Sequence, residues 1–188
     1  MDTRILLIRH AESEWNADGR WQGQADPGLS PEGRAQAEAL AASLADARLE
    51  VLVASDLDRA RETADRVGRA TGLVPVLDPR FRELDVGSWS GLRREEIAAR
   101  DPELLAGFES GEPDVRPGGG ETRREIRLRV RDAAAELRET YAGRRVALVT
   151  HLGVIRALWP GTEMANAEAR WWEPEETEVA AQREAGPL

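Results

Sequence analysis

The stretch Ile5-Leu6-Leu7-Ile8-Arg9-His10 decides the fold, because it joins a short apolar run to a polar end. The stretch Val146-Ala147-Leu148-Val149-Thr150-His151 repeats this pattern near the other end of the chain. Runs of four apolar residues without polar alternation are typical of central strands that helices cover on both faces. Each run is followed by one polar residue and then by one of the chain's two histidines. The pattern predicts two buried strands, each with a histidine at its carboxyl end.

Further strands and helices are expected between these two runs. The apolar segments Val51–Val53 and Val74–Leu77 predict two short strands. Ser30 and Pro31 predict a helix start with a serine N-cap and a proline in the first turn. The apolar residues of that helix recur at helical spacing: Ala37, Leu40, Ala41 and Leu44.

Two more helices are predicted, one over 57–70 that ends at Gly72 and one over 121–141 that stops at Gly143. Alternating strands and helices favour a parallel sheet with helices on both faces. The predicted fold is therefore α/β, a three-layer α/β/α sandwich with a mainly parallel central sheet.

The expected domain organisation is one catalytic domain over 1–165, with a tail of uncertain structure over 166–188. Proline and glycine pairs within 92–120 predict short helices and loops, which form a small lid over the C-terminal strand ends. In the tail, Trp171-Trp172-Glu173-Pro174 is not expected to form a strand, and Thr177–Ala181 is a weak strand candidate.

Composition excludes several function classes. The 188 residues contain no cysteine, so disulfides, thiolate metal sites and cysteine nucleophiles are absent. A net charge of −9 argues against nucleic-acid or anionic-membrane partners. No apolar run is long enough to cross a bilayer, and a cytoplasmic protein is expected. All the basic residues are arginines; phosphate binding and genomic base content are alternative explanations.

The two histidines mark the expected site, because ligands of open α/β sheets bind outside the carboxyl ends of the strands. The alternative is that both are ordinary loop residues. Arg59 follows a strand in Ser55-Asp56-Leu57-Asp58-Arg59-Ala60, in the first turn of the next predicted helix. A cation there is unfavourable because it opposes the helix dipole, and a bound anion would offset that cost. Its alternative is a solvated arginine paired with Asp56 or Glu62.

An acidic candidate lies in the loop Phe81–Gly91, which contains two glycines and a tryptophan. Glu83 is the expected proton donor and Asp85 its rival from the same loop. Either of the two carboxylates could instead be only a surface charge.

Seven segments together resemble the histidine phosphatase superfamily, in its phosphoglycerate-mutase-like branch. The resemblance covers residues 4 to about 158 and rests on the order of these segments rather than on any one of them. They are Arg9–Asn16, Gln22-Gly23 with Asp26, Leu29–Gly33, Ser55–Ala64, Glu83–Gly91, Pro117–Glu121 and Thr150–Arg156.

The resemblance implies a role for each matching residue. His10 attacks phosphorus and carries the phosphoryl group, and Glu83 protonates the leaving group. The remaining matches contact the phosphate or the substrate: Arg9, Asn16, Arg59, His151, Ser13, Gln22, Gly23 and Leu152. The family requires no metal and no cofactor, and its substrates are small-molecule phosphate esters.

Three positions depart from the family pattern. Ala11 replaces a common glycine, and its methyl group is tolerated if the backbone angles are ordinary. Leu152 replaces a glycine after the second histidine and could narrow the pocket or require a negative φ. The tail lacks a recognisable strand near residue 170, and its tryptophans hint at a homodimer contact.

Three functions compete: a metal-independent phosphomonoesterase, a cofactor-dependent phosphoglycerate mutase, and an inactive relative that binds phosphate or serves as a scaffold. Mutases carry a longer, basic insertion between the acidic loop and the Pro-Gly-Gly motif, whereas 92–116 is short here. Every catalytic residue type is present, which argues against the inactive relative. The phosphatase is therefore favoured. Its natural substrate is left open, with the lid and the region of Trp15 and Trp21 expected to set specificity.

Overall fold

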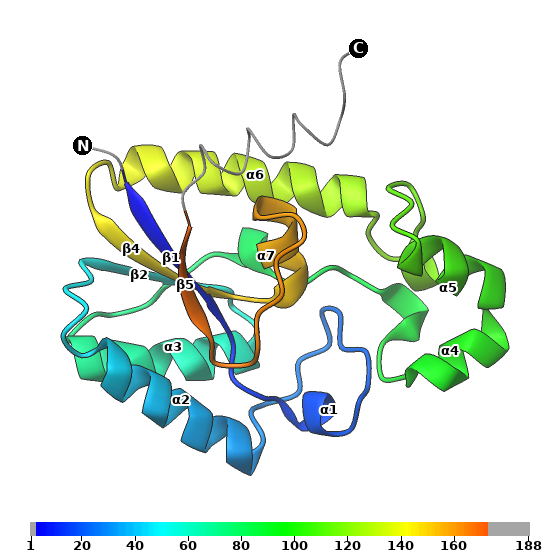
Figure 1. The fold of residues 1–188 in the computed structure, drawn as a ribbon, viewed down its shortest axis with the longest axis horizontal. Helices are drawn as coiled ribbons and strands as arrows, with labels where there is room; N and C mark the ends of the chain where they lie inside the picture. The colour runs from blue at the N-terminus through cyan, green and yellow to red at the C-terminus, as the bar shows by residue number, and fades with distance from the viewer. Residues whose placement is uncertain (1–2, 173–188) are drawn as a thin grey trace.

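The computed structural model describes residues 3–172, which fold around a five-stranded sheet (Figure 1). The strands lie in the order β3-β2-β4-β1-β5. They are β1 (Arg4–Arg9), β2 (Val51–Ala54), β3 (Val76–Leu77), β4 (Arg145–Thr150) and β5 (Ala169–Trp172). The first four are parallel to their neighbours, and β5 pairs antiparallel with β1. The predicted, mainly parallel sheet is confirmed.

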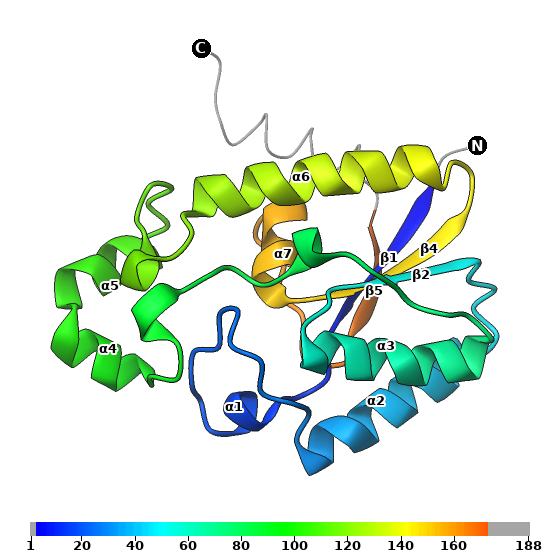
Figure 2. The same cartoon turned by 180° about the vertical axis from the view of Figure 1, so that it is seen from behind.

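Helices cover both faces of the sheet, as Figures 1 and 2 show from opposite sides. Helices α2 (Pro31–Leu44) and α3 (Asp58–Thr71) lie on one face, and α6 (Arg123–Thr140) and α7 (Leu152–Leu158) on the other. Side chains of a strand alternate between the faces, so Leu6 and Ile8 pack with α2 and α3. Ile5 and Leu7 pack with α6 and α7. The three-layer sandwich predicted from the sequence is confirmed.

Caps explain where the long helices begin and end, and those at Ser30 and Gly72 are the predicted ones. The Ser30 hydroxyl accepts the Gly33 N–H at 2.9 Å at the start of α2. Thr122 and Glu125 form a capping box, which starts α6 two residues later than predicted. Helix α3 ends at Gly72, whose φ of 75° is left-handed and therefore suits glycine.

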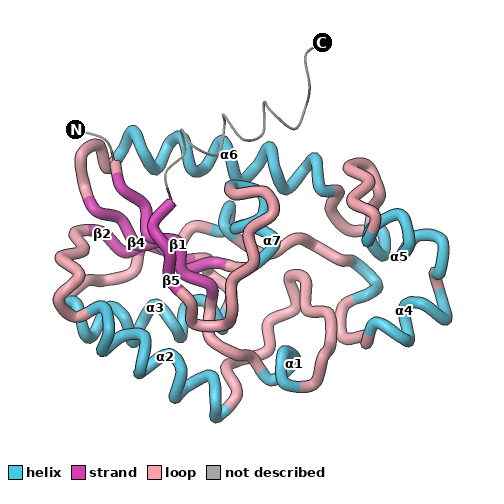
Figure 3. The backbone as a smooth tube through the Cα atoms, in the orientation of Figure 1, coloured by secondary structure: helices cyan, strands magenta, loops and turns pink. Residues whose placement is uncertain are grey.

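The lid extends beyond one end of the sheet, where Figure 3 shows mostly loops and short helices. It contains α4 (Arg94–Arg100), α5 (Pro102–Glu109) and the 3₁₀ turn η3 (Pro117–Gly119). The chain also forms α1 (Glu14–Ala17) and two more 3₁₀ turns, η1 (Pro79–Phe81) and η2 (Gly87–Trp89). A Cβ on Gly87 would lie 2.2 Å from the Gly118 carbonyl oxygen, so η2 and η3 interlock through glycines.

Aromatic side chains fix the lid to the body. Trp89 is fully buried, and its indole N–H donates to the Asp101 carboxylate at 2.7 Å. The rings of Trp21, Trp89 and Phe108 meet edge to face, with centroids 5.4 to 6.1 Å apart. Trp21 therefore combines lid packing with a position on the cavity described below.

The sequence expectation for the segment near residue 170 was wrong, because Ala169–Trp172 is the edge strand β5. Its register places Trp172 opposite Ile5 and Ala169 opposite Ile8. Trp172 is buried, whereas the Trp171 ring lies under the guanidinium groups of Arg4 and Arg145. This strand has only four residues, and the polar residues around Trp171 and Trp172 obscure its strand pattern in the sequence. The strand candidate Thr177–Ala181 lies outside the described residues. Within residues 3–172, no helix is long and apolar enough to cross a membrane.

Candidate active site

His10 and His151 come together at the carboxyl ends of the neighbouring strands β1 and β4. Arg9 pairs with Thr150 in the register of the sheet, so the next residue on each strand is a histidine. The ring centroids are 5.0 Å apart, with an angle of 58° between the ring planes. Both side chains are buried. The convergence predicted from the strand pattern is confirmed, and the alternative of two unrelated loop residues is wrong.

A single hydrogen bond determines the tautomer of His10. Its Nδ1 lies 2.7 Å from the Ala11 carbonyl oxygen, and because a carbonyl can only accept, Nδ1 carries the proton. Nε2 then holds a lone pair. Burial and the nearby Arg59 guanidinium hold the pKa of His10 well below its ordinary value of 6.5. His10 therefore presents a neutral, nucleophilic nitrogen.

Arg59 lies at the start of α3 with no exposed surface. Its two terminal nitrogens donate to the carbonyls of Gly23 and Ala25, at 2.9 and 2.8 Å, and its buried Nε has no partner. The alternative of a solvated ion pair is wrong, since Asp56 pairs with Arg82. Burial lowers the pKa of Arg59 to about 10, partly offset by the Glu83 carboxylate.

Arg9 adds a second guanidinium to the same cavity. It donates to the Met164 carbonyl oxygen at 2.7 Å, and its buried Nε has no partner. Burial lowers the pKa of Arg9, and the Glu83 carboxylate acts in the opposite direction. Two guanidinium groups bonded only to backbone carbonyls leave their charge available to an anion.

Asn16 and Gln22 line the cavity, with Ser13 behind them. The Ser13 hydroxyl lies 2.6 Å from the Gln22 amide oxygen and 3.1 Å from that of Asn16. Because both amide oxygens are engaged, the N–H groups of the two amides remain as donors. Ser13 is fully buried and serves as their support, and Gly23 provides the carbonyl that holds Arg59.

His151 is buried next to His10, without a place in the cavity wall. Its Nε2 lies 2.8 Å from the Ser55 hydroxyl, and its buried Nδ1 has no partner. Burial, Arg59 and His10 together hold the pKa of His151 well below 6.5. The ring is therefore neutral in the unliganded protein.

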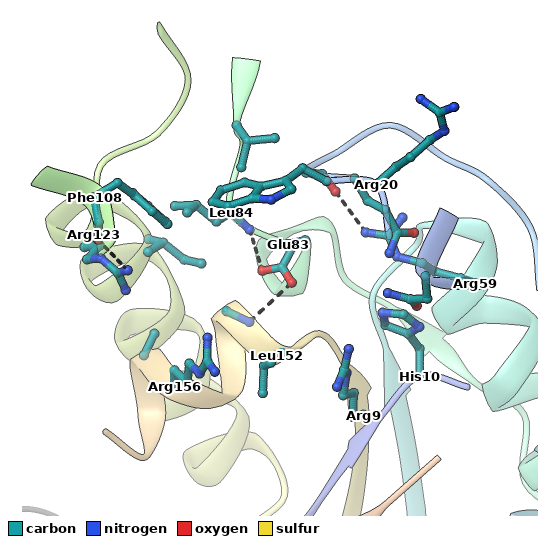
Figure 4. Close-up of a pocket in the computed structure, with 18 of the residues that line it drawn as sticks. Arg9, His10, Arg20, Arg59, Glu83, Leu84, Phe108, Arg123, Leu152 and Arg156 are labelled. Carbon is teal, nitrogen blue, oxygen red and sulfur yellow. Dashed lines mark hydrogen bonds between the residues drawn. The ribbon is translucent and has the colours of Figure 1, made fainter. Parts of the chain in front are cut away.

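Glu83, rather than its rival Asp85, points into the cavity (Figure 4). Its carboxylate accepts the N–H groups of Leu84 at 2.8 Å and Gly153 at 3.2 Å. Asp85 instead accepts the Gly87 N–H at 2.8 Å and lines a separate surface pocket. The geometry thus separates the two carboxylates and places Glu83, the expected donor, in the cavity.

Leu152 and Ala11 fit their positions without strain, because neither has a positive φ. Leu152 is the first residue of α7 and lines the cavity. The close approach occurs one residue later, where a Cβ on Gly153 would lie 2.1 Å from Glu83 Oε1. The sequence analysis did not identify this role of Gly153. The feature that could have indicated it is the glycine directly after Leu152.

The cavity has a volume of about 370 Å³ and a strong excess of positive charge. Among the described residues that line the cavity, only Glu83 carries a carboxylate. Six arginines line it, of which sequence reasoning identified only the first two: Arg9, Arg59, Arg20, Arg123, Arg127 and Arg156. Within residues 3–172, no three His, Asp or Glu side chains cluster in a way that could hold a metal ion.

Comparison with known proteins places the chain in a family. The sequence model of the histidine phosphatase superfamily (branch 1) matches residues 5–181. The metal-independent phosphoserine phosphatase of Arabidopsis thaliana is 39% identical over 171 residues, which cover 89% of this chain and 72% of that protein. Phosphoserine phosphatase 1 of Hydrogenobacter thermophilus is 36% identical over 156 residues, 83% and 74% of the two chains.

A solved structure shows the same fold. A mycobacterial glucosyl-3-phosphoglycerate phosphatase in complex with VO3 superposes with a TM-score of 0.82 at 36% identity, over 89% of this chain and 90% of that one. The chain belongs to the histidine phosphatase superfamily (branch 1). The expected family and the expected phosphoric monoester hydrolase are thereby confirmed.

The depressed histidine pKa values can be tested by proton NMR, because the chain has only two histidines. In phosphate-free buffer, neither imidazole C2–H resonance should titrate near pH 6.5; both rings stay neutral well below that value. Inorganic phosphate should shift both titrations upward, since its charge offsets the arginines. A resonance that titrates near 6.5 in the folded, phosphate-free protein contradicts the buried, arginine-flanked site.

The same shifts make stability depend on pH. The unfolded chain protonates both imidazoles below about pH 6.5 while the folded chain does not. Lowering the pH through 6.5 should therefore decrease the free energy of unfolding.

The Gly153→Ala substitution should displace the Glu83 carboxylate while leaving residue 83 a glutamate, because the added methyl group would lie 2.1 Å from Glu83 Oε1. We expect kcat on a phosphate ester to fall by roughly 10²–10⁴, the range for lost acid–base catalysis. The double variant Gly153→Ala/Glu83→Gln should be no slower than Glu83→Gln alone. Additive losses would show that Gly153 acts through something other than Glu83.

Proposed function

We propose that this chain is a metal-independent phosphomonoesterase that hydrolyses small phosphorylated metabolites through a phosphohistidine on His10. The observation that carries this proposal is the neutral Nε2 of His10 in a cavity beside Arg59. A buried guanidinium without a carboxylate partner favours an anion in contact with it.

In the first step the Nε2 lone pair attacks phosphorus, and the bond from phosphorus to the ester oxygen breaks. Glu83, in its acid form, gives a proton to the departing oxygen, so the alcohol leaves neutral. Phosphoryl transfer proceeds through a loose transition state, in which positioning and charge stabilisation supply most of the catalysis. Arg9 and Arg59 supply positive charge, and the Asn16 and Gln22 amides supply donors.

In the second step a water molecule attacks the phosphohistidine, and Glu83, now ionised, takes its proton. The bond between phosphorus and Nε2 breaks, orthophosphate leaves, and His10 returns to its starting tautomer. The Nδ1 hydrogen bond to Ala11 persists through both steps, which keeps Nε2 directed at phosphorus. His151, with its unpartnered Nδ1, is proposed to contact the phosphoryl group once it is bound.

The contacts of the lid favour a phosphatase over a mutase. Three of its arginines are engaged in surface ion pairs: Arg94 with Glu109, Arg100 with Asp101, and Arg116 with Glu125. No arginine of 92–116 lines the cavity. The lid therefore lacks the basic contribution that a mutase insertion makes to its substrate's carboxylate. The relatives named for phosphoserine and glucosyl-3-phosphoglycerate support a small metabolite as substrate.

A cytoplasmic location, a homodimer and the catalytic domain boundary at 165 stay predictions. The structure adds that β5 lies beyond that boundary and completes the sheet.

The His10→Ala variant should lose hydrolysis of p-nitrophenyl phosphate while keeping a native circular dichroism spectrum. During turnover of a ³²P-labelled ester in the presence of EDTA, the unmodified protein should yield acid-labile, base-stable label on the polypeptide. The variant should yield none, because Nε2 is the only proposed acceptor. Turnover by the variant at the unmodified rate would exclude the covalent mechanism, and loss of activity in EDTA would reveal a required metal ion.

The choice between phosphatase and mutase is decided by one substrate. With 3-phosphoglycerate and catalytic 2,3-bisphosphoglycerate, we expect release of orthophosphate without formation of 2-phosphoglycerate, measured by ³¹P NMR. The engaged lid arginines are the physical reason, since they leave the cavity without the mutase's basic insertion. Accumulation of 2-phosphoglycerate faster than orthophosphate would identify a mutase.

A further inference from the structure

The cavity has a second cationic end that the reaction above does not use. Figure 4 shows Arg123 and Arg156 on the opposite side of Glu83 and Leu152 from Arg9, His10 and Arg59. A phosphoryl group at His10 is already met by two guanidinium groups and two amides. The further arginines therefore require a different explanation.

Arg123 is held in place by the lid. Its Nη2 donates to the Phe108 carbonyl oxygen at 3.0 Å, and its guanidinium lies 4.2 Å from the centroid of the Phe108 ring. Its Nε is buried without a hydrogen-bond partner. Arg123 is also the first residue of α6, where a cation opposes the helix dipole. The unpartnered Nε and the cation at the start of α6 are both unfavourable, and an anion in contact with the guanidinium offsets both.

Arg127 and Arg156 bring two more positive charges to the same end of the cavity. Arg127 lies one turn after Arg123 on α6, a like-charge spacing that is unfavourable in an isolated helix. Within residues 3–172 its guanidinium has no hydrogen bond or ion pair. Arg156 comes from α7 and is paired with an exposed carboxylate, that of Glu163. Both charges depress the pKa of Arg123, after the larger effect of burial, so the three groups are close enough to repel one another.

We propose that Arg123, Arg127 and Arg156 form a second anion subsite, and that the preferred substrates carry a carboxylate or a second phosphate in addition to the scissile phosphate. This inference rests on the proposed function and adds the substrate class to it. Guanidinium groups bind both kinds of anion in two-point fashion. Six arginines line the cavity, and of these only Arg20 and Arg156 have an ion-pair partner within residues 3–172, Asp18 and Glu163. The four others still exceed what one phosphate dianion needs, in a chain whose net charge is −9.

The subsite also suits a small substrate. The two cationic ends share one cavity of about 370 Å³, near the lower limit of ordinary ligand sites. Leu84, Ile126 and Ala157 give its wall an apolar part for the carbon skeleton. The phosphate end and the second anionic end can therefore be occupied by one compact molecule.

Matched pairs of substrates test the subsite. 3-Phosphoglycerate and glycerol 3-phosphate differ only by a carboxylate in place of a hydroxymethyl group. Fructose 1,6-bisphosphate and fructose 6-phosphate differ by a second phosphate. Orthophosphate release is measured for the unmodified protein, for Arg127→Gln/Arg156→Gln, and for the control Arg131→Gln. Arg131 is exposed on α6 one turn beyond Arg127 and does not line the cavity.

In at least one pair, we expect the unmodified protein to favour the substrate with the additional anionic group by roughly tenfold or more in kcat/KM. That ratio corresponds to one hydrogen bond with a charged group. The double variant should lose that preference, whereas Arg131→Gln should keep it. A preference confined to the first pair identifies a carboxylate, and one confined to the second pair identifies a phosphate. No preference, or equal losses on both members of a pair, would overturn the subsite, because general attraction of anions acts on both alike.

Failure of the proposed function is distinguishable from failure of the subsite. If the unmodified protein releases no orthophosphate from any ester, the phosphatase proposal fails. Calorimetric binding of 3-phosphoglycerate and glycerol 3-phosphate to the same three proteins then decides the subsite. Tighter binding of 3-phosphoglycerate that disappears in the double variant supports it, and equal binding contradicts it.

Discussion

Arg59 carries a guanidinium that is buried away from water without a carboxylate in contact with it, and much of the site is arranged around that charge. The carbonyls of Gly23 and Ala25 satisfy its donors but not its charge. They also explain why the loop before α2 must pass close to the start of α3. Gly23, with a φ of 54°, leaves no room for a Cβ against Val86. The position of the charge that we propose meets the phosphate is thus set by contacts with the backbone.

The same charge acts on His10, the proposed nucleophile. An imidazole attacks phosphorus only when it is neutral, and Arg59 opposes protonation of both histidines. The Ala11 carbonyl then selects which nitrogen of His10 keeps its lone pair. No base is needed to remove a proton from the nucleophile. In the proposed mechanism Glu83 therefore serves only the leaving group and the water molecule. Its carboxylate is held by one N–H from its own loop and one from α7.

The sequence was sufficient to predict features with strong local signals and insufficient for those created by packing. The runs before His10 and His151 predicted both central strands, since apolar continuity identifies strands buried on both faces. Strand β5 escaped because a four-residue edge strand has little periodicity. Gly153 and the cavity arginines Arg123, Arg127 and Arg156 were not identified from the sequence for another reason. Their roles arise from α6 and α7 meeting the acidic loop, a proximity that no spacing along the chain encodes.

The position of β1 has a consequence for how the protein is made. This strand pairs with β4 and β5, although Arg4 precedes its partner Arg145 by 141 positions and β5 follows later still. The backbone of His10 is held from the same late region, by Asn166 and by the Ala167 N–H. At about 5–20 residues per second, His10 of the nascent chain waits on the order of ten seconds for these partners. A nascent chain that ends before β4 contains His10, Arg59 and Glu83 but lacks His151, and its strand β1 has neither of its hydrogen-bonding partners.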